Sequence, residues 1–153
     1  MRICTLLLII KDNQVLLAMK KRGFGANLWN GVGGKLNDGE SIEDALIRET
    51  QEEINVTPTF FQKVAIHDFT FPNGETDMQV HTYLCTQWEG EPTESEEMAP
   101  QWFNIAEIPY DTMWQDDRYW MPQVFTGKKL RTTFAFDDNN NLLTQKVETV
   151  TEL

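Results

Sequence analysis

The segment from Ser41 to Ile54 carries the strongest helix signal in the chain, and its apolar pattern breaks off halfway. Ser41 is a favourable N-cap, and the acidic residues at 43 and 44 lie in the first turn, where the helix dipole favours negative charge. An apolar stripe begins at positions 42, 45 and 46, and helical spacing continues it to 49, 52 and 53. Those positions hold Glu49, Glu52 and Glu53. The face that we expect to be buried therefore gathers three carboxylates.

Three carboxylates on one helical face repel each other, and partial burial raises their pKa values unless a cation balances them. Grouped carboxylate oxygens suit Mg²⁺, with Mn²⁺ as a substitute. Arg48 stands four residues before Glu52 and can pair with part of the cluster. The alternative is a solvated, glutamate-rich helix end, which predicts no Mg²⁺-dependent change in thermal stability.

Strand patterns and turns surround this helix, and no repeat or linker divides residues 1–153, so we expect one domain. The predicted strands cover residues 3–10, 15–19, 60–71, 78–88, 102–103, 128–136 and 142–150. A second helix is predicted at 117–125, although Pro122 lies within it. Many strands with two main helices predict an α+β fold, in which the helices cover the faces of a mixed sheet.

The chain has 24 acidic and 13 basic residues, which gives a formal net charge of −11. This balance argues against nucleic-acid polymers and anionic membranes as partners, because both need a basic face. The apolar run 3–10 is too short to span a bilayer, and no cleavage site follows it. Cys4 and Cys85 sit in apolar runs without zinc-type spacing, as expected of thiols in a reducing compartment. We therefore expect a cytoplasmic, monomeric protein.

A second pattern starts ahead of the helix and runs into it. It consists of residues at fixed spacings, namely Gly34, Glu40, Arg48, Glu49, Glu52, Glu53 and Val56. The spacing resembles the Nudix box, the signature of hydrolases that cleave nucleoside diphosphates linked to another moiety. The resemblance implies a Nudix-type α/β/α sandwich.

Two positions depart from the Nudix pattern. Thr50 stands where the family has an aliphatic residue, and Asn55 stands where it has glycine. We expect Thr50 to be tolerated because it lies at the edge of the apolar stripe. Asn55 ends the helix, where a left-handed conformation is needed, and asparagine is the next best residue after glycine there. Neither departure removes a charge that the chemistry needs.

The resemblance implies roles for the glutamates of the helix. Glu49, Glu52 and Glu53 would bind the metal, with Glu53 closest to its centre. Arg48 would pair with part of this catalytic cluster and orient it. The backbone carbonyl of Gly33 would add a further metal ligand.

Nudix enzymes often take one more carboxylate, as ligand or as base, from a distal loop. The acidic loop at 89–100 offers Glu97 as the candidate, with Glu94 and Glu96 as alternatives. A metal held by these groups would polarise the phosphoryl oxygens and lower the pKa of a bound water. An acidic protein can bind an anionic polyphosphate in this way.

Three segments outside the box, 20–25, 29–35 and 113–120, resemble the Nudix group that acts on oxidised purine nucleoside triphosphates. This resemblance implies Mg²⁺-dependent hydrolysis of 8-oxo-dGTP and 2-hydroxy-dATP to the monophosphate and pyrophosphate, which keeps damaged nucleotides out of DNA. The box alone leaves other substrates open: another modified purine triphosphate, a dinucleotide polyphosphate or ADP-ribose. A non-catalytic nucleotide-binding domain is the alternative from another class of protein.

The side chains of these segments fit a purine pocket. Trp114 offers a flat face for stacking, worth about 1–3 kcal/mol per base. Asp116 and Asp117 can accept hydrogen bonds from the base and share one proton, because two close charges disfavour double ionisation. Exchanging the protonated member would let one pocket read both 8-oxoguanine and 2-hydroxyadenine. Asn30 would add a donor and an acceptor.

By resemblance, further residues line this pocket: Thr5, Lys20, Phe24, Phe69 and Met78, with Lys20 facing the ligand. From the residues alone, the aspartates fit a helix cap equally well, and the apolar side chains fit the core. His67 and His81 show no ligand spacing, and we assign them no role.

Overall fold

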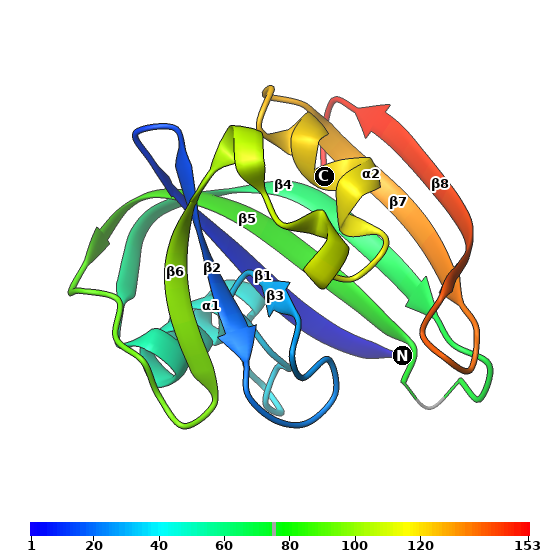
Figure 1. Cartoon of the computed structure of the whole chain (residues 1–153), viewed down its shortest axis with the longest axis horizontal. Coiled ribbons are helices and arrows are strands. Elements are labelled where there is room, and N and C mark those ends of the chain that lie inside the picture. Colours follow the sequence, from blue (N-terminus) through cyan, green and yellow to red (C-terminus); the bar gives the residue numbers. More distant parts are fainter. Residues whose placement is uncertain (75) are drawn as a thin grey trace.

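One mixed sheet organises residues 1–74 and 76–153, which the computed structural model describes (Figure 1). Its strands are β1 (Arg2–Lys11), β2 (Gln14–Lys20), β3 (Trp29–Asn30), β4 (Thr57–Thr70), β5 (Met78–Glu89), β6 (Met98–Asn104), β7 (Lys129–Phe136) and β8 (Leu142–Val150). They lie in the order β3-β2-β1-β5-β4-β7-β8, and β6 pairs with β2. The pairs β1–β5 and β4–β7 are parallel, whereas the other described pairs are antiparallel.

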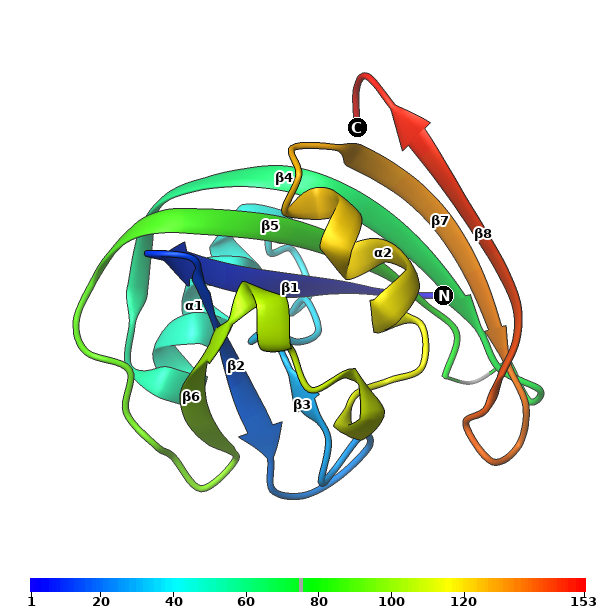
Figure 2. The ribbon, with the colours of Figure 1, turned by 45° about the horizontal axis from the view of Figure 1, so that its top comes forward.

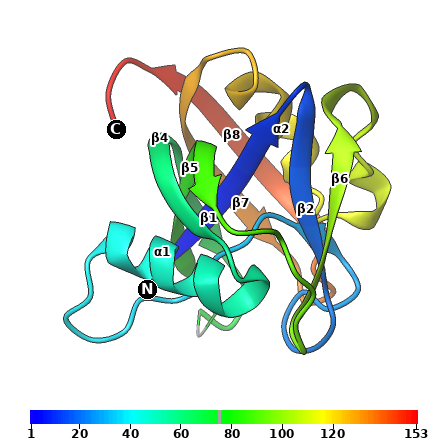
Figure 3. The ribbon, with the colours of Figure 1, turned by 90° about the vertical axis from the view of Figure 1, so that its left-hand side faces the viewer.

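Two helices cover opposite faces of this sheet, as Figures 2 and 3 show. They are α1 (Ile42–Ile54) and α2 (Asp117–Val124), and the short 3₁₀ turns η1 (Ile105–Glu107) and η2 (Tyr110–Thr112) precede α2. No helix in the described ranges is long and apolar enough to span a membrane.

Alternation along β1 supplies both layers of the core, because successive side chains of a strand point to opposite faces. Leu6 and Leu8 belong to the apolar cluster that includes Trp120 of α2. Leu7 and Ile9 belong to the cluster on the α1 face. This arrangement confirms the predicted α+β sandwich with two main helices.

The two strands that pair with β2 at this end of the sheet, β6 and β3, are longer than predicted or were not predicted at all. Residues 102–103 were expected to form a short strand, but β6 pairs with β2 from Met98 to Asn104. Pro100 lies inside β6, which is at an edge of the sheet, where proline is tolerated. The two-residue strand β3 was not predicted.

Helix α1 begins and ends as its sequence predicts. The Ser41 Oγ accepts the Asp44 N–H at 3.1 Å, and Asn55 adopts a left-handed conformation with φ of 60°. The buried face of α1 runs through Ala45, Leu46, Thr50, Glu53 and Ile54. The expectation that Thr50 lies at the edge of this face is wrong: Thr50 is fully buried. Its hydroxyl group is tolerated because it donates to the Leu46 carbonyl at 2.7 Å.

The left-handed conformation of Asn55 predicts the effect of two substitutions. We expect Asn55→Ala to lower the free energy of unfolding by about 1 kcal/mol, because a Cβ without a local polar partner disfavours this conformation. Asn55→Gly should leave the stability unchanged or raise it slightly. Urea unfolding of both variants checks this, and equal midpoints for the alanine variant and the wild type would contradict it.

Candidate active site

A cavity of about 290 Å³ opens on the α2 face of the sheet. It brings together every side chain that the sequence analysis assigned to the base pocket: Thr5, Lys20, Phe24, Asn30, Phe69, Met78, Trp114, Asp116 and Asp117. They come from strands β1 to β5, from the loop between β2 and β3, and from the start of α2 with the segment before it. Gly33 lines the same cavity.

Part of the lining was not predicted from the sequence, including Arg2, Cys4, Lys35, His67, Phe71, Val80, Met98, Trp120 and Phe136. Strand alternation offers a signal for some of them. Phe71 follows Phe69 by two residues and Val80 follows Met78 by two, so each pair shares one face of the sheet. Phe136 carries no such signal, because only the pairing of β4 with β7 brings it to the cavity.

Aromatic rings form one wall of the cavity. The ring centroid of Trp114 lies 5.1 Å from that of Phe24 and 5.4 Å from that of Phe136. Phe24 also packs edge-on against Phe71 at 5.6 Å and is 45% exposed, which places it at the cavity mouth. These rings present flat faces on which a purine can stack.

The loop that carries Trp114 is tied to the β7–β8 hairpin. Gln115 donates from Nε2 to the Asn141 Oδ1 at 2.9 Å, and its Oε1 accepts the Leu142 N–H at 2.8 Å. Because Gln115 stands between Trp114 and Asp116, these two hydrogen bonds help to fix the positions of both neighbours.

Asp116 and Asp117 are almost fully buried, with 2% and 3% of their surface exposed. Asp116 makes no capping hydrogen bond, so the helix-cap interpretation is wrong for it. It accepts instead from the Trp120 Nε1 at 2.9 Å.

The same two carboxyl groups have strongly shifted pKa values. Burial raises the pKa of Asp116 to about 6. Burial, followed by the charge of Asp116, raises the pKa of Asp117 well above its ordinary value. The Asp117 Oδ2 has no hydrogen-bond partner within residues 1–74 and 76–153. The pair therefore gives up its last proton at a higher pH than an ordinary carboxyl group does.

Asn30 and Lys20 are held by neighbours in the chain. The Asn30 Oδ1 accepts the Gly31 N–H at 2.9 Å, so Nδ2 is the donor that Asn30 presents to the cavity. The Lys20 Nζ donates to the Phe24 carbonyl at 2.5 Å. Lys20 therefore stabilises the loop at the cavity mouth and adds a positive charge to the lining.

The backbone of Gly33 and Gly34 connects the cavity with α1. A Cβ at residue 33 would lie 1.9 Å from the Thr5 carbonyl oxygen, and a Cβ at residue 34 would lie 2.5 Å from the Glu49 carboxyl carbon. Only glycine permits such close approach to the backbone at residue 33, whereas a side chain at residue 34 would displace the Glu49 carboxyl group. The Gly33 N–H donates to the Glu53 Oε1 at 3.2 Å, so this loop reaches the carboxylates of α1 directly.

Glu53 is the carboxylate that α1 buries. It is 7% exposed, and its Oε2 has no hydrogen-bond partner in the described part of the chain. Burial and the nearby charge of Glu49 raise the pKa of Glu53 to about 8, although the Gly33 N–H acts in the opposite direction. An unsatisfied buried polar group costs about 1–3 kcal/mol, and more when charged. Glu53 therefore needs either a proton or a cation.

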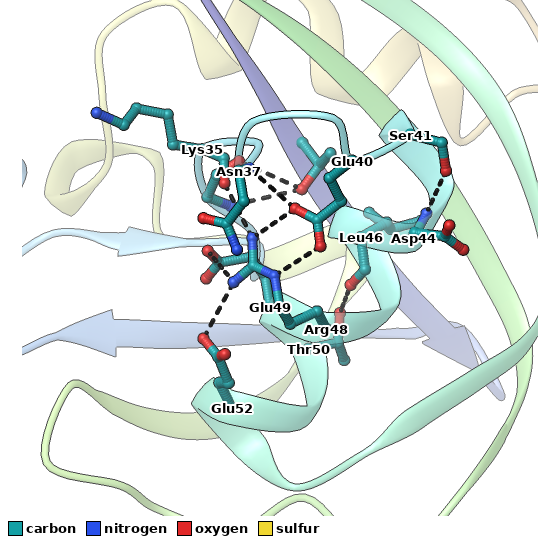
Figure 4. Close-up of polar contacts among 12 residues, drawn as sticks. Lys35, Asn37, Glu40, Ser41, Asp44, Leu46, Arg48, Glu49, Thr50 and Glu52 are labelled. Atoms are coloured by element: carbon teal, nitrogen blue, oxygen red, sulfur yellow. Dashed lines mark hydrogen bonds and ion pairs between the residues drawn. The ribbon is translucent and has the colours of Figure 1, made fainter.

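Arg48 binds the other carboxylates of this region (Figure 4). It makes two hydrogen bonds to Glu40, at 2.8 and 2.9 Å, and its Nη1 donates to Glu49 at 3.0 Å and to Glu52 at 3.2 Å. The guanidinium lowers the pKa of Glu40 to about 2. The Glu52 side chain remains 60% exposed. The expectation that three glutamates share one buried face is therefore wrong for Glu52, which lies on the flank of the helix beside Arg48.

The whole-chain comparisons agree with this geometry. Residues 2–124, more than half of the chain, match the model of the NUDIX domain. The chain belongs to the Nudix family. It is 43% identical over 149 residues to the oxidized purine nucleoside triphosphate hydrolase of Mus musculus. The aligned region covers 97% of this chain and 96% of the mouse protein. The Danio rerio protein of the same name is 43% identical over 153 residues, covering 99% and 97%.

Solved structures of Nudix proteins share the fold. The crystal structure of a MutT protein from Bacillus halodurans matches with a TM-score of 0.86 and 26% sequence identity, covering 97% of this chain and 98% of that one. Nudix hydrolases generally use divalent metal ions.

The Nudix box of this chain fits a divalent cation through two of its glutamates. The carboxyl groups of Glu49 and Glu53 lie next to each other, and their oxygens are hard ligands. In the described part of the chain, the buried Oε2 of Glu53 has no hydrogen-bond partner. Among the described residues, no group of three His, Cys, Asp or Glu side chains is placed to hold a metal ion. Glu52 contacts Arg48 instead, and it would join the other two only by leaving that guanidinium. Glu49 and Glu53 are therefore the side chains that would hold an ion.

The distal loop of this Nudix domain is held by basic residues. The Glu97 Oε1 lies 2.8 Å from the Arg22 guanidinium, and Glu96 lies 3.8 Å from the same group. Glu94 pairs with Lys21. These contacts place the loop against the segment that leads to the cavity mouth, and the role of Glu97 as a further ligand or base stays a prediction.

Proposed function

We propose that this Nudix protein hydrolyses oxidised purine nucleoside triphosphates, 8-oxo-dGTP and 2-hydroxy-dATP among them, to the monophosphate and pyrophosphate. Mg²⁺ is the proposed metal, and Mn²⁺ a substitute. The observation that carries the proposal is the buried Asp116–Asp117 pair in an aromatic cavity whose Gly33 and Gly34 wall contacts the carboxylates of α1. The names of the mouse and zebrafish relatives support it.

The cavity supplies a complementary group for each part of an oxidised purine. Trp114 and Phe24 would stack on the base. The ionised member of the Asp116–Asp117 pair would accept N–H donors from the base edge, and the protonated member would donate to a base oxygen. Asn30 would donate from Nδ2. Because the proton can lie on either aspartate, the same pocket would accept the donor patterns of 8-oxoguanine and of 2-hydroxyadenine.

The α1 side of the cavity would handle the polyphosphate. Glu49 and Glu53 would hold the divalent ion, which when bound offsets phosphate charge and supplies a water of lowered pKa. The Gly33 N–H keeps Glu53 in place, and Arg48 keeps Glu49 oriented. Lys20 would attract the phosphates toward the cavity mouth. The two proposed metal ligands are thus side chains that other residues of the chain hold in place.

The proposal includes the setting in which the enzyme acts. A net charge of −11 opposes binding to nucleic-acid polymers, whereas free nucleotides can be bound through a metal. Cys4 and Cys85 are both free thiols, which suits a reducing compartment. We therefore propose a cytoplasmic monomer in which residues 1–153 form one domain that acts on the nucleotide pool.

Hydrolysis of a panel of nucleotides, with and without Mg²⁺ and with the products separated by chromatography, tests the proposal. The panel contains 8-oxo-dGTP, 2-hydroxy-dATP, dGTP, dATP, ADP-ribose and a dinucleotide polyphosphate. We expect the two oxidised triphosphates to have the highest kcat/KM, and we expect chelation of the metal to abolish turnover. A higher kcat/KM for ADP-ribose or a dinucleotide polyphosphate would contradict the proposed substrate. Nucleotide binding without turnover would contradict the proposed activity.

A further inference from the structure

A buried histidine lies at the back of the base cavity. His67, on β4, lines the cavity and is 0% exposed. Its Nδ1 lies 2.6 Å from the Thr132 Oγ1 on the neighbouring strand β7, within hydrogen-bond distance. Burial lowers the pKa of His67 to about 3, so the imidazole is neutral. The sequence gives this residue no role, and the proposed chemistry does not use it.

The His67 ring lies against Trp120, the residue that contacts the aspartate pair. The two ring centroids are 4.3 Å apart, and the ring planes are inclined at 48°. Trp120 is 1% exposed and donates from Nε1 to the Asp116 Oδ2 at 2.9 Å. Contacts therefore run without a break from Thr132 in the sheet, through His67 and Trp120, to the carboxyl group of Asp116.

The hydrogen bond from Trp120 to Asp116 affects which aspartate holds the shared proton. A donor to a carboxyl oxygen favours the ionised form of that group. The Trp120 N–H donates to Asp116, so it favours ionised Asp116 and leaves the proton on Asp117. The strength of this bias depends on the position of the indole ring, because hydrogen bonds weaken steeply with distance and angle. His67 supports that ring from the side of the sheet.

We propose that His67, held in one orientation by Thr132, is a positioning residue for base recognition. It keeps the Trp120 indole on Asp116 and so sets the relative preference of the enzyme for the two oxidised purines. This inference rests on the proposed function, since it concerns how the same pocket discriminates between its substrates. A role in packing alone would contribute stability without affecting that discrimination.

The hydroxyl group of Thr132 provides the sharpest test. Thr132→Val removes the oxygen bonded to His67 and keeps the branched shape, whereas Thr132→Ser keeps the oxygen. The quantity to measure is the quotient of kcat/KM for 8-oxo-dGTP over kcat/KM for 2-hydroxy-dATP. We expect Thr132→Val to change this quotient about fivefold, the effect of one hydrogen bond, mainly through KM. Thr132→Ser should restore the wild-type quotient.

Two histidine variants complete the experiment. His67→Phe keeps a ring against Trp120 but lacks Nδ1, and we expect it to change the quotient in the same direction as Thr132→Val. His81→Phe is the matched control, because His81 is also buried but sits one position from Val80 on β5, so it points to the other face of the sheet. Thermal unfolding of each variant reports the cost in stability.

The outcomes separate this inference from the proposed function. If the wild type hydrolyses both triphosphates and Thr132→Val melts earlier but keeps the wild-type quotient, His67 only packs and the inference is wrong. If His81→Phe changes the quotient as much as His67→Phe, the effect comes from a general loss of packing in the sheet, and the inference is again wrong. If the wild type hydrolyses neither triphosphate, the proposed function is wrong and the inference falls with it.

Discussion

Replacing Glu53 by glutamine is expected to lower kcat/KM for the triphosphate substrate by about a thousandfold or more while the protein remains folded. Glutamine keeps the shape of the side chain and can still accept the Gly33 N–H, but it cannot supply a negative charge to a divalent ion. Initial rates of pyrophosphate release at saturating Mg²⁺ measure the effect. Activity within tenfold of the wild type would contradict the role that we propose for Glu53.

Although Glu53→Gln should lower activity, it should raise the stability of the metal-free protein at alkaline pH. The folded-state pKa of Glu53 is about 8, against an ordinary value of 4.5. A raised carboxyl pKa contributes stability below about pH 4.5 that is lost as the pH rises through about 8, where the buried group must ionise. Without metal, Glu53→Gln should therefore unfold at a higher temperature than the wild type at alkaline pH. Added Mg²⁺ should raise the melting temperature of the wild type only.

A second glutamate on the same helix provides the control. Glu43 lies in the first turn of α1, is exposed and does not line the cavity. Glu43→Gln removes the same charge from the same helix, so we expect kcat/KM to stay within about twofold of the wild type, as for most surface substitutions. An equal loss of activity in both variants would indicate that helix charge in general, and not the buried carboxylate, matters.

Asp117→Asn is expected to weaken binding of 8-oxo-dGMP by about tenfold to a hundredfold. Asparagine keeps the size of the side chain but cannot exchange a proton with Asp116, so the pocket loses one of its two donor patterns. The monophosphate is the probe because it carries the base without needing the metal site for turnover. Calorimetric titration in a chelating buffer measures the affinity, and an unchanged Kd would contradict the proposed role of Asp117.

The shared proton also predicts how affinity depends on pH. The pKa of Asp117 is raised well above its ordinary value by burial and by Asp116, so the pair keeps a proton beyond the pH at which an ordinary carboxyl group ionises. As the pH rises through that raised pKa, the proton leaves, a second buried charge appears, and both folding stability and base affinity decrease. Affinity of the wild type for 8-oxo-dGMP should therefore fall as the pH rises through the raised pKa of Asp117, and Asp117→Asn should lose this decline.

Asp111 supplies the matched control for the aspartate pair. It lies in η2, its side chain is 97% exposed, and it pairs with Arg118. Asp111→Asn makes the same chemical change six residues earlier, outside the base cavity. We expect an unchanged Kd for 8-oxo-dGMP and an unchanged pH profile. A similar loss of affinity there would point to long-range charge effects in place of direct recognition.

Local patterns predicted most of the elements correctly, and they failed where a residue depends on distant partners. Helix α1 was predicted to the residue because its N-cap, its stripe and its left-handed end are all encoded within the segment. The extent of β6 was underestimated because its pairing with β2 outweighs the unfavourable Pro100. The sequence analysis also put Glu52 on the buried face and Thr50 at its edge, whereas Glu52 is exposed and Thr50 is buried, since small differences in rotation decide which residues near the edge of a stripe are buried.

In the base cavity too, residues within one short segment were predicted, and residues brought in by distant strands were missed. Asp116, Asp117 and Trp114 were predicted because the segment 113–120 that carries them resembles a known Nudix group. Phe136 and His67 were missed because apolar or neutral residues on strands give no signal of function. They reach the cavity through the parallel pairing of β4 with β7, which joins segments more than sixty residues apart.

The sequence by itself determined that carboxylates interrupt the apolar face of one helix, and that an acidic protein of net charge −11 carries a Nudix box. Only the tertiary structure decided which carboxylate is buried with one oxygen unpaired among the described residues: Arg48 binds Glu52, whereas Glu53 is buried and uses only Oε1, which accepts the Gly33 N–H. Charge and spacing are local properties of the chain. Burial, and the pKa shifts that follow from it, are produced only when distant segments exclude water from the same place.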